Sequence, residues 1–372
     1  MAHIALDLRF WRANTGGLGR YSRNLLSELL KLDQTNQYTA VITAEDEPEF
    51  NLTAPNLKKL VVDIGHYSSS EQTKLNRILN QQNFDLVHFA NFNHPIFYRR
   101  PFVVTVHDLI MHLYPTGAQK SSPWRRLAYK TVMNDCRRAA KIIVPSSSTK
   151  NDLVKLLKFP YHKIVITPEG SEAKFRPQTK ATIEKVRAKL GVPAEYLLFV
   201  SRWEKYKGLP ALIEAYQRLS SQHPELGLVI CGKPDKQNPE VAELVMQSQQ
   251  THSKIITPGF ISDDELVALY AGAAVYVHPS WYEGFGIMIL EAFSAGAPVI
   301  TSNVSSLPEV VGDAGLLVDP HNTDDLTAAI EKIITDPKLA EGLRQKGFVR
   351  AQQFSWSKMA EQTLVVYKEV LN

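Results

Sequence analysis

The chain has few features of a disulfide-stabilised, zinc-binding or membrane-spanning protein. Its two cysteines, Cys136 and Cys231, lie far apart and form no C-x-x-C pair, which disfavours a zinc site and a disulfide framework. Isolated cysteines fit a reducing compartment, so the cytoplasm is the expected location. No stretch approaches the ~20 apolar residues that are needed to cross a bilayer. If the protein acts at a membrane, we expect it to lie peripherally on the cytoplasmic face.

The chain also lacks a large excess of charge of one sign. The 42 basic and 38 acidic residues give a formal net charge of +4, which makes no case for a nucleic-acid partner. An apolar fraction of 44% is ordinary for a folded protein, and 372 residues favour two domains over one. Because Asp7 and Arg9 interrupt the first apolar residues, this segment is predicted to be a strand and not a signal peptide.

What the sequence does contain is a long alternation of strand-like and helix-like segments. The strand-like runs of the first half lie at 3–10, 39–44, 59–64, 84–89, 101–107, 141–146 and 163–167, and helical patterns include 71–82 and 123–139. A polar stretch at 170–182 is typical of an interdomain linker. The second half has strand-like runs at 196–202, 226–231, 254–258, 274–279 and 298–302. This alternation predicts two doubly wound α/β domains, with ligands in a cleft between them.

The segment 275–292 reads as a buried strand, a glycine turn and a helix. Gly284 and Gly286 remove side-chain bulk from the turn, so backbone N–H groups can approach a bound anion or polyol closely. Glu283 and Glu291 place two carboxylates around the helix start, and carboxylates accept hydrogen bonds from paired hydroxyls. A nucleotide sugar carries a sugar, a diphosphate and a ribose, which would match all of these groups. The alternative is an ordinary strand-to-helix turn with a surface glutamate.

Other polar groups fall at the ends of strand-like runs. Residues 11–19 form a predicted loop with Gly16 and Gly17, which is a weak dinucleotide fingerprint because the third glycine is missing. His107 ends another run, where a histidine is as often a structural hydrogen-bonding group as a catalyst. Arg202 and Lys207 follow the first strand of the second half and could neutralise a diphosphate.

Two further segments keep alternative interpretations open. Gly259, Phe260 and Ile261 could seat a base through their backbone groups, although the Ser262-Asp263-Asp264-Glu265 sequence that follows is also an ordinary helix start. Residues 120–141 carry seven basic residues against the single acid Asp135. That basic face could lie on anionic lipid, but such a helix more often packs its apolar stripe and solvates its charges. The stripe consists of Trp124, Leu127, Ala128, Thr131 and Val132.

Taken together, these motifs resemble the retaining glycosyltransferases of family 4, which have the GT-B fold of two Rossmann-like domains facing a central cleft. The matching residues are Gly16-Gly17, His107-Asp108, Arg202 with Lys207-Gly208, and Glu283-Gly284-Phe285-Gly286 with Glu291. The similarity covers nearly the whole chain, and its most specific part is the E-x7-E element with its internal G-F-G. The Gly-Gly-Leu-Gly-Arg-Tyr loop looks most like bacterial mannosyl- or glucosyltransferases that build surface polysaccharide.

The resemblance implies an acceptor-side domain at 1–177 and a nucleotide-sugar donor domain at 178–356. The segment Phe354-Ser355-Trp356 resembles the family's crossover, after which a terminal helix at 357–372 packs back on the first domain. No cofactor is implied beyond the nucleotide-sugar co-substrate. The acceptor would be a saccharide or a lipid-linked saccharide, and GDP-mannose is the favoured donor, with UDP-glucose or another UDP-sugar next.

The resemblance also assigns roles by position. The catalytic set would be His107 beside the anomeric centre, Glu283 on the transferred sugar, and Arg202 and Lys207 on the donor diphosphate. The backbone of Gly284, Phe285, Gly286 and Ile287 would hold hydroxyls and phosphate, Glu291 would hold the ribose, and Gly16 and Gly17 would close on the phosphates. No D-x-D triplet occurs in the chain, which disfavours a metal-bridged diphosphate and makes the two cations the expected substitute for a metal.

The sequence leaves more than one mechanism and more than one activity open. A front-face mechanism, in which the departing phosphate accepts the acceptor's proton, requires no enzyme nucleophile, and a double displacement through a carboxylate remains possible. A nucleotide-sugar epimerase or hydrolase would share the diphosphate contacts. A non-catalytic nucleotide-sugar-binding protein is a third reading, and a nucleic-acid-binding role is the weakest because no recognised motif occurs.

Overall fold

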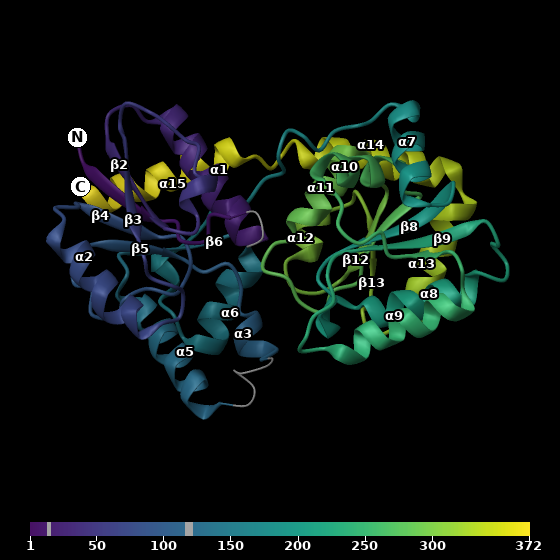
Figure 1. The fold of residues 1–372 in the computed structure, drawn as a ribbon, viewed down its shortest axis with the longest axis horizontal. Coiled ribbons are helices and arrows are strands. Elements are labelled where there is room, and N and C mark those ends of the chain that lie inside the picture. Colours follow the sequence, from purple (N-terminus) through teal and green to yellow (C-terminus); the bar gives the residue numbers. More distant parts are fainter. Residues whose placement is uncertain (13–15, 116–121) are drawn as a thin grey trace. The chain divides into compact units, whose positions relative to one another are not determined.

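The computed structural model describes residues 1–12, 16–115 and 122–372. Its internal contacts divide the chain into two compact units (Figure 1). Unit 1 consists of Met1–Glu169 and Ser355–Asn372, and unit 2 consists of Gly170–Phe354. Each unit has one parallel sheet.

The sheet of unit 1 has seven strands in the order β3-β2-β1-β4-β5-β6-β7. Their bounds are β1 His3–Asp7, β2 Gln37–Thr43, β3 Leu57–Val62, β4 Leu86–Phe89, β5 Phe102–Thr105, β6 Lys141–Val144 and β7 Ile164–Ile166. The central strands β4 and β5 are buried along their whole length. Helices that cover both faces of a parallel sheet explain why these strands read as continuous apolar runs and not as alternating ones.

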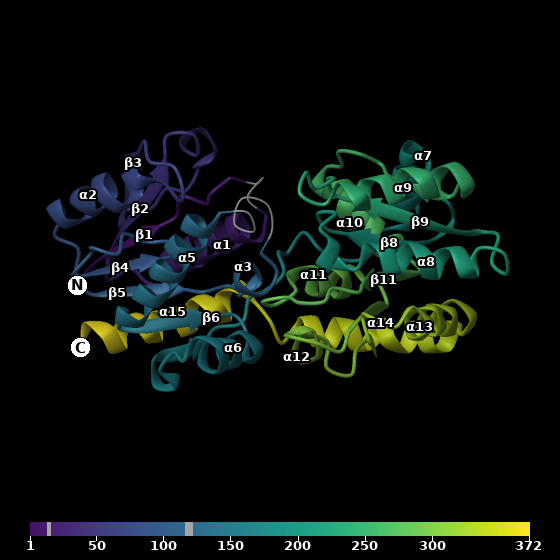
Figure 2. The same ribbon diagram turned by 90° about the horizontal axis from the view of Figure 1, so that it is seen from below.

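The helices of unit 1 surround this sheet (Figure 2). They are α1 Gly17–Leu32, a π-helical turn η3 Glu71–Leu75 that continues into α2 Asn76–Gln81, α3 Ile110–Leu113, α5 Pro123–Asp135, α6 Ser147–Leu157 and α15 Trp356–Leu371. Short 3₁₀ turns are η2 Glu47–Glu49, η4 Cys136–Arg138 and η5 Tyr161–Lys163. The last helix, α15, packs along α1 and also contacts β4 and β6. The C-terminal end of the chain therefore belongs to the same unit as its N-terminal end.

Unit 2 has six strands in the order β10-β9-β8-β11-β12-β13. The strands are β8 Glu195–Val200, β9 Leu226–Cys231, β10 Ile255–Ile256, β11 Val275–His278, β12 Val299–Ser302 and β13 Leu316–Val318. The helices are α7 Lys180–Leu190, α8 Leu209–Leu219, α9 Pro239–Thr251, α10 Asp263–Gly272, α11 Ile287–Ala295, α12 Leu307–Val311, α13 Thr323–Thr335 and α14 Pro337–Ala351, with a 3₁₀ turn η6 at Lys205–Lys207. The core of the unit joins β8, β9 and β11 to α8, α9 and α13.

The structure corrects several predicted element bounds. The strand β13 was not predicted, because it has only three residues, of which only Val318 is fully buried, and so short a run gives too weak an apolar signal. The predicted loop at 11–19 ends earlier, because α1 begins at Gly17; its residues 13–15 lie outside the described residues. The predicted helix at 123–139 ends at Asp135 and is followed by the turn η4.

The boundary between the units also differs from the predicted position at 177. The segment 170–177 belongs to unit 2, because Phe175 is buried and packs edge-on against Tyr270 of α10, with ring centroids 5.9 Å apart. Lys174 adds an ion pair to Asp263, 2.6 Å away. The polar sequence of this segment suggested a free linker, but the Phe175 ring and the Lys174 ion pair attach it to α10.

Each sheet reverses its strand order once, and that reversal marks where ligands of such sheets usually bind. In unit 1 the reversal lies between β1 and β4, and in unit 2 it lies between β8 and β11. At such a point the connections of two neighbouring strands leave in opposite directions and open a crevice beyond their carboxyl ends. The residues that follow these four strands are therefore the first candidates for a ligand site.

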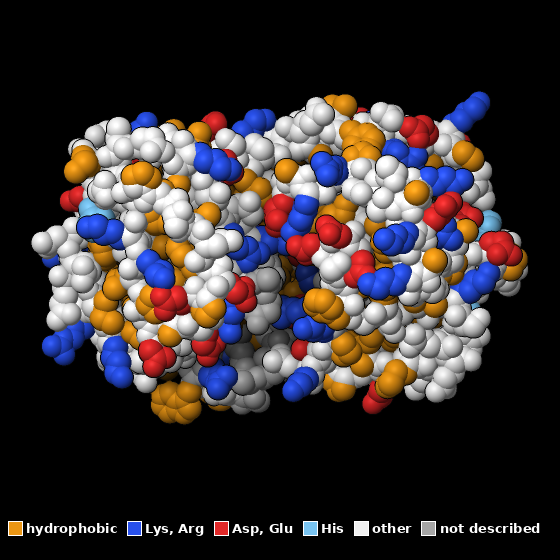
Figure 3. Space-filling view, turned by 45° about the horizontal axis from the view of Figure 1, so that its top comes forward, with side chains coloured by type: hydrophobic (Ala, Val, Ile, Leu, Met, Phe, Trp, Pro, Cys, Tyr) orange, Lys and Arg blue, Asp and Glu red, His pale blue; other side chains and the backbone are white. Residues whose placement is uncertain are grey.

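The surface mixes charges of both signs. On the described part of the face in Figure 3, Lys and Arg side chains lie among Asp and Glu side chains over both units. None of the described helices is long enough and apolar enough to span a bilayer.

Candidate active site

The reversal point of unit 2 holds a buried carboxylate with three donors. Glu283, which follows β11, accepts hydrogen bonds at Oε1 from Lys207 Nζ at 2.7 Å, His278 Nε2 at 2.8 Å and Ser280 Oγ at 2.7 Å. Lys207 and Glu283 are 7% and 6% exposed. No described residue donates to the second oxygen, Oε2. The side chain is thus fixed through one oxygen, and the other can accept a ligand hydroxyl.

The geometry of this site depends on Gly208, which follows Lys207. Gly208 has φ +74°, and a Cβ at this position would lie 2.0 Å from the carbonyl oxygen of Pro279. Only glycine allows the loop after β8 to lie this close to the loop after β11. The close approach brings the Lys207 ammonium to Glu283, 76 positions further along the chain.

A second glycine shapes the start of α11. Gly286 has φ +106° and caps the helix, and a Cβ there would lie 3.2 Å from Leu307 and 3.3 Å from Ile289. Phe285 and Ile287 are buried, and the Phe285 ring packs against Phe354 at 5.7 Å. The turn is therefore rigid, and its backbone N–H groups lie at the positive end of the helix dipole.

Electrostatics keep Glu283 ionised. Burial by itself raises the pKa of Glu283, but the Lys207 charge and the hydrogen bond from His278 outweigh that effect and hold the pKa well below its ordinary value. Tyr276 OH lies 3.1 Å from His278 Nδ1. An imidazole ring that accepts from Tyr276 at Nδ1 and donates to Glu283 from Nε2 satisfies both contacts.

Glu291 has a different environment from Glu283. It is 1% exposed, and Tyr270 OH donates to its Oε2 over 3.4 Å. The Tyr270 and Tyr276 rings pack edge to face at 5.2 Å, so an aromatic pair links the surroundings of the two carboxylates. Sequence reasoning found Glu283 and Glu291 but missed His278, Ser280, Tyr270 and Tyr276. His278 at the end of β11 was the one visible signal among them.

The other predicted donor-site residues of unit 2 lie at the same sheet edge but make weaker contacts. The Arg202 side chain is 74% exposed and pairs with Glu204 at 3.1 Å. Gly259 has φ +75°, Phe260 is 88% exposed, and Ile261 is half-buried. The following residues form a capping box in which Ser262 and Glu265 satisfy the start of α10, as the alternative interpretation expected.

In unit 1, His107 is held at both ring nitrogens. Nδ1 lies 3.1 Å from Glu169 Oε1, and Nε2 lies 2.9 Å from the carbonyl oxygen of Ala90. Because an ionised carboxylate and a carbonyl only accept hydrogen bonds, a ring that donates from both nitrogens satisfies both contacts. Burial lowers the pKa of His107, but Glu169 outweighs this effect and raises it above the ordinary value. Both ring nitrogens are engaged by protein groups, so neither is free to accept a proton from a substrate.

Behind His107 lies a buried hydrogen-bonded chain that sequence reasoning missed. The Tyr21 ring packs edge-on against His107 at 4.6 Å, and Tyr21 OH lies 2.9 Å from Thr105 Oγ1. Thr105 in turn lies 2.8 Å from His88 Nε2, and His88 Nδ1 lies 2.6 Å from Tyr367 OH of α15. Burial lowers the pKa of His88 to about 3, so its ring is neutral.

Gly16 and Gly17 lie where the sequence placed them relative to β1, but as the cap and first residue of α1. Gly16 has φ +65°, and a Cβ at either glycine would meet open space. The turn is therefore exposed and has room for a ligand. The expectation that both glycines close on donor phosphates stays a prediction, as does a site between the two domains.

Comparison with known proteins identifies the family. Residues 15–174 match the family described as Glycosyltransferase Family 4, and residues 182–350 match Glycosyl transferases group 1. The O-antigen chain mannosyltransferase B of Escherichia coli is 33% identical over 76% of this chain and 74% of its own length. The chain belongs to the family 4 glycosyltransferases.

Other relatives of this glycosyltransferase include longer proteins. The serotype-specific mannosyltransferase WbdA of Escherichia coli is 26% identical over 93% of the chain, but the match spans 45% of that protein. A D-inositol 3-phosphate glycosyltransferase of Corynebacterium aurimucosum is 30% identical over 62% of the chain and 57% of its own length.

Solved structures confirm the GT-B fold of the glycosyltransferase. The sucrose-phosphate synthase of Thermosynechococcus elongatus superposes with a TM-score of 0.79 at 23% identity, over 100% of this chain and 99% of the other. Anabaena HepE in complex with UDP and glucose superposes with a TM-score of 0.77 at 17% identity, over 99% and 100% of the two chains. At these identities the likeness concerns the fold alone.

Proposed function

We propose that this glycosyltransferase transfers a hexose from a nucleotide-diphosphate sugar to a saccharide or lipid-linked saccharide. Mannose is the favoured sugar, and the transfer retains the anomeric configuration. The observation that carries the proposal is the buried Lys207–Glu283 pair at the reversal point of the unit 2 sheet, with one carboxylate oxygen left for a ligand. Burying two charges is costly unless they are paired, and such an arrangement at a sheet's ligand-binding edge indicates a functional site.

Charge development gives each residue a task in this proposal. Breaking the anomeric C–O bond creates an oxocarbenium-like sugar and a negative diphosphate. Lys207 gives one of its three N–H donors to Glu283, which leaves two for phosphate oxygens. The exposed Arg202 guanidinium adds a second cation on a side chain long enough to reorient. Glu283 accepts a sugar hydroxyl at Oε2, and Glu291 accepts ribose hydroxyls.

The acceptor hydroxyl must also lose its proton in the same step, so a group that accepts this proton is needed. Both ring nitrogens of His107 are engaged by Glu169 and by the Ala90 carbonyl oxygen, so the ring does not supply a base there. Acceptance of the proton by the departing phosphate, as in a front-face mechanism, is compatible with this state. The positive ring would instead help to keep negative charge on the phosphate. We propose that no metal or other cofactor is required, because Lys207 and Arg202 provide the counter-charge.

The donor is proposed from the relatives. Two of them are named as mannosyltransferases, and GDP-mannose is accordingly the first donor to test. UDP-glucose is the alternative, since the HepE structure contains UDP and glucose. Thermal-shift screening against GDP, UDP and ADP separates these possibilities, because a ligand that binds only the folded state raises its melting temperature.

A donor-turnover assay tests the activity itself. The purified chain is incubated with GDP-mannose or UDP-glucose, with and without a saccharide acceptor and with EDTA. Acceptor-dependent release of nucleoside diphosphate, an α-linked product seen by NMR and no loss of rate with EDTA would support the proposal. Epimerised donor without acceptor would indicate an epimerase, and donor binding without turnover would indicate a binding protein. Either result would refute the transferase proposal.

We also propose that α5 places the enzyme on an anionic lipid surface. The predicted apolar stripe does not pack as expected: Trp124 is 80% exposed and Leu127 is 56% exposed, while α5 is anchored by Tyr129 and Met133. The packing interpretation of this stripe is therefore wrong. An exposed tryptophan and leucine beside basic residues are typical of a helix that lies in the lipid interface.

Vesicle binding tests the role of α5. Neutralising Arg125, Arg126 and Lys130 together, or replacing Trp124 and Leu127 by alanine, should reduce co-sedimentation with phosphatidylglycerol vesicles and leave binding to neutral vesicles low. Replacing the basic residues Lys185 and Lys189 of α7 in unit 2 is the matched control. Unchanged co-sedimentation of the α5 variants would exclude this surface.

A further inference from the structure

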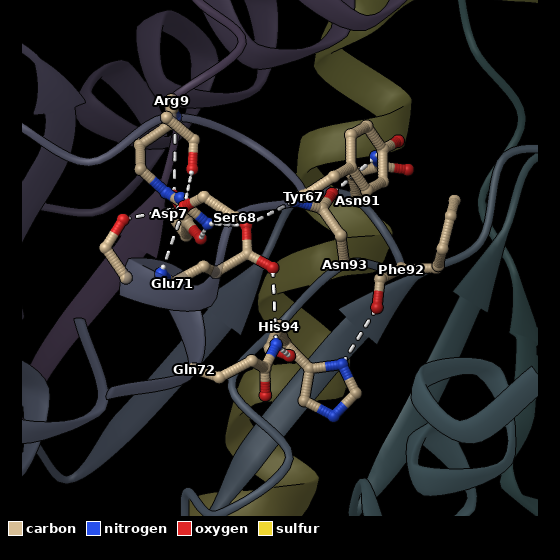
Figure 4. Close-up of polar contacts among 12 residues, drawn as sticks. Asp7, Arg9, Tyr67, Ser68, Glu71, Gln72, Asn91, Phe92, Asn93 and His94 are labelled. Atoms are coloured by element: carbon tan, nitrogen blue, oxygen red, sulfur yellow. Dashed lines mark hydrogen bonds and ion pairs between the residues drawn. The ribbon is translucent and has the colours of Figure 1, made fainter. Parts of the chain in front are cut away.

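The reversal point of the unit 1 sheet holds a second buried polar cluster, which the donor site does not use (Figure 4). Arg9, just after β1, donates from Nε and Nη2 to the two oxygens of Asp7 at 2.8 Å each, and from Nη2 to Glu71 Oε2 at 3.0 Å. Glu71 opens the π-helical turn η3. The guanidinium therefore joins the end of β1 to the helix that follows β3.

The same cluster continues to the residues after β4. Asn93 Nδ2 donates to Glu71 Oε2 at 2.9 Å, and Asn91 Nδ2 donates to Asn93 Oδ1 at 2.6 Å. Asn91 also reaches Tyr67 OH at 3.5 Å. Asn91 and Asn93 are 7% and 3% exposed. A continuous line of polar contacts thus runs from the fully buried Arg9 to Tyr67 at the surface.

Two atoms of this cluster have no hydrogen-bond partner. Arg9 is 2% exposed, yet its Nη1 has none among the described residues, and neither does Nδ1 of His66, whose ring stacks on Phe10 at 3.7 Å. Leaving such atoms unsatisfied inside a protein is costly, so buried polar groups nearly always find a partner in the protein, in water or in a ligand. Within the described residues, the cluster therefore has room for at least one further hydrogen-bonding partner.

Tyr67 presents its aromatic ring to solvent at the outer end of the cluster. It is 57% exposed and has φ +55°, a conformation that L side chains rarely adopt. Its ring lies 6.4 Å from Phe10 and 6.0 Å from Phe92, and its hydroxyl end lies against Asn91. An aromatic ring whose position is fixed while it remains half exposed provides an apolar face beside hydrogen-bonding groups, which suits a sugar ring.

The charge of the cluster limits what it can bind. Asp7 and Glu71 carry two negative charges against the single positive charge of Arg9. The Tyr67 hydroxyl meets this cluster through Asn91, so a ligand on the Tyr67 ring lies near two carboxylates and one guanidinium. Such surroundings favour hydroxyl donors and repel a phosphate.

We propose that the Arg9–Glu71–Asn91–Tyr67 cluster is the acceptor subsite, in which a neutral, unphosphorylated sugar residue stacks on Tyr67 and its hydroxyls hydrogen-bond to the Tyr67 hydroxyl and the Asn91 amide at the outer end of the cluster. This inference rests on the proposed glycosyltransferase function and adds the class of acceptor. Arg9 is a positioning residue in this subsite: it holds Glu71 and, through Asn93 and Asn91, the Tyr67 hydroxyl.

Disaccharide binding tests the subsite independently of turnover. Affinity for mannobiose is measured by NMR saturation transfer with GDP bound, and GDP affinity is measured in parallel. The Tyr67→Ala variant should bind mannobiose about fivefold to tenfold more weakly, whereas Tyr67→Phe should stay close to the wild type because the ring is kept. GDP affinity should not change in either. Tyr161→Ala, another exposed tyrosine of unit 1, is the matched control.

Phosphorylated mannobiose tests the charge argument. The wild type should bind it about tenfold more weakly than mannobiose. Glu71→Gln keeps the shape of the side chain but removes one negative charge, so the two ligands should differ less in affinity for this variant. Unchanged mannobiose affinity in Tyr67→Ala, or a wild-type preference for the phosphorylated ligand, would overturn the inference while donor binding remains intact. Loss of nucleotide binding by the wild type would instead contradict the proposed function.

Discussion

Replacing Glu283 by glutamine removes one charge from the candidate site and almost no volume. The amide oxygen can take the place of Oε1 and still accept from Lys207, His278 and Ser280. What is lost is the ion pair, whose atoms lie 2.7 Å apart. At that distance the attraction is about 6 kcal/mol for an effective dielectric constant of ~20, before any desolvation is counted.

Part of this attraction only offsets the cost of burying the two charges. Removing one partner of a buried pair leaves the other uncompensated and typically costs about 3–5 kcal/mol. A loss of about 3 kcal/mol lowers the melting temperature of a domain of 150 to 250 residues by roughly 6 to 12 °C. Adding Lys207→Met should restore part of this loss, because no uncompensated charge then remains.

The pH dependence of the same variant has a defined sign. The folded-state pKa of Glu283 is depressed, so the pair stabilises the fold above the ordinary value of 4.5 and loses its effect as pH falls below it. The difference in melting temperature between wild type and Glu283→Gln should therefore be large at neutral pH and shrink in acid. Donor turnover should fall by about a hundredfold or more at neutral pH.

Thermal unfolding and initial rates of nucleoside diphosphate release measure these effects. Glu341→Gln, in an exposed pair with Arg344, is the matched control and should change neither value, since exposed pairs contribute little. A Glu283→Gln protein that melts with the wild type and keeps its rate would refute the reasoning. A double variant as unstable as the sum of both single changes would refute the pairing specifically.

Three further substitutions test the positions around the site. Gly208→Ala should destabilise unit 2 by more than about 2 kcal/mol and abolish turnover, because its Cβ clashes with a backbone carbonyl at positive φ. Glu169→Gln should lower the pKa of His107. In the wild type, Glu169 raises this pKa, and a raised histidine pKa stabilises the fold below the ordinary value of 6.5 and not at high pH. The variant should therefore lose more melting temperature near pH 5 than near pH 9. Tyr367→Phe should cost about 1–3 kcal/mol by leaving His88 Nδ1 unpaired.

Gly208→Ala and Tyr367→Phe each have a control variant, and Glu169→Gln is compared with itself at two pH values. Gly342→Ala in α14, where a Cβ meets open space, should be neutral or stabilise by up to about 1 kcal/mol. Tyr161→Phe on the surface should leave stability unchanged. A Gly208→Ala protein as stable as Gly342→Ala, equal losses for Glu169→Gln at both pH values, or a Tyr367→Phe protein that melts with Tyr161→Phe would each contradict the contact concerned.

Much of the fold could be read from the sequence because buried parallel strands are continuous apolar runs. Strands such as β9 and β11 lie where these runs predicted them. The three-residue strand β13 was missed for the opposite reason, since Leu317 is exposed and the apolar signal is short. The attachment of 170–177 to unit 2 could not be predicted either, because a polar segment with one buried aromatic residue has the same sequence pattern as a free linker.

The same distinction holds for the site. The sequence by itself determined which chemical groups stand at the ends of strands, such as Lys207 after β8 and Glu283 after β11, because strand ends and glycine turns are local features. Only the tertiary structure decided which of them meet. Lys207 is buried on Glu283 while Arg202, five residues earlier, stays in solvent, and His107 finds Glu169 at a separation of 62 residues. Such partners depend on which loops the sheet places side by side and, at Gly208, on a backbone approach that no side chain would permit.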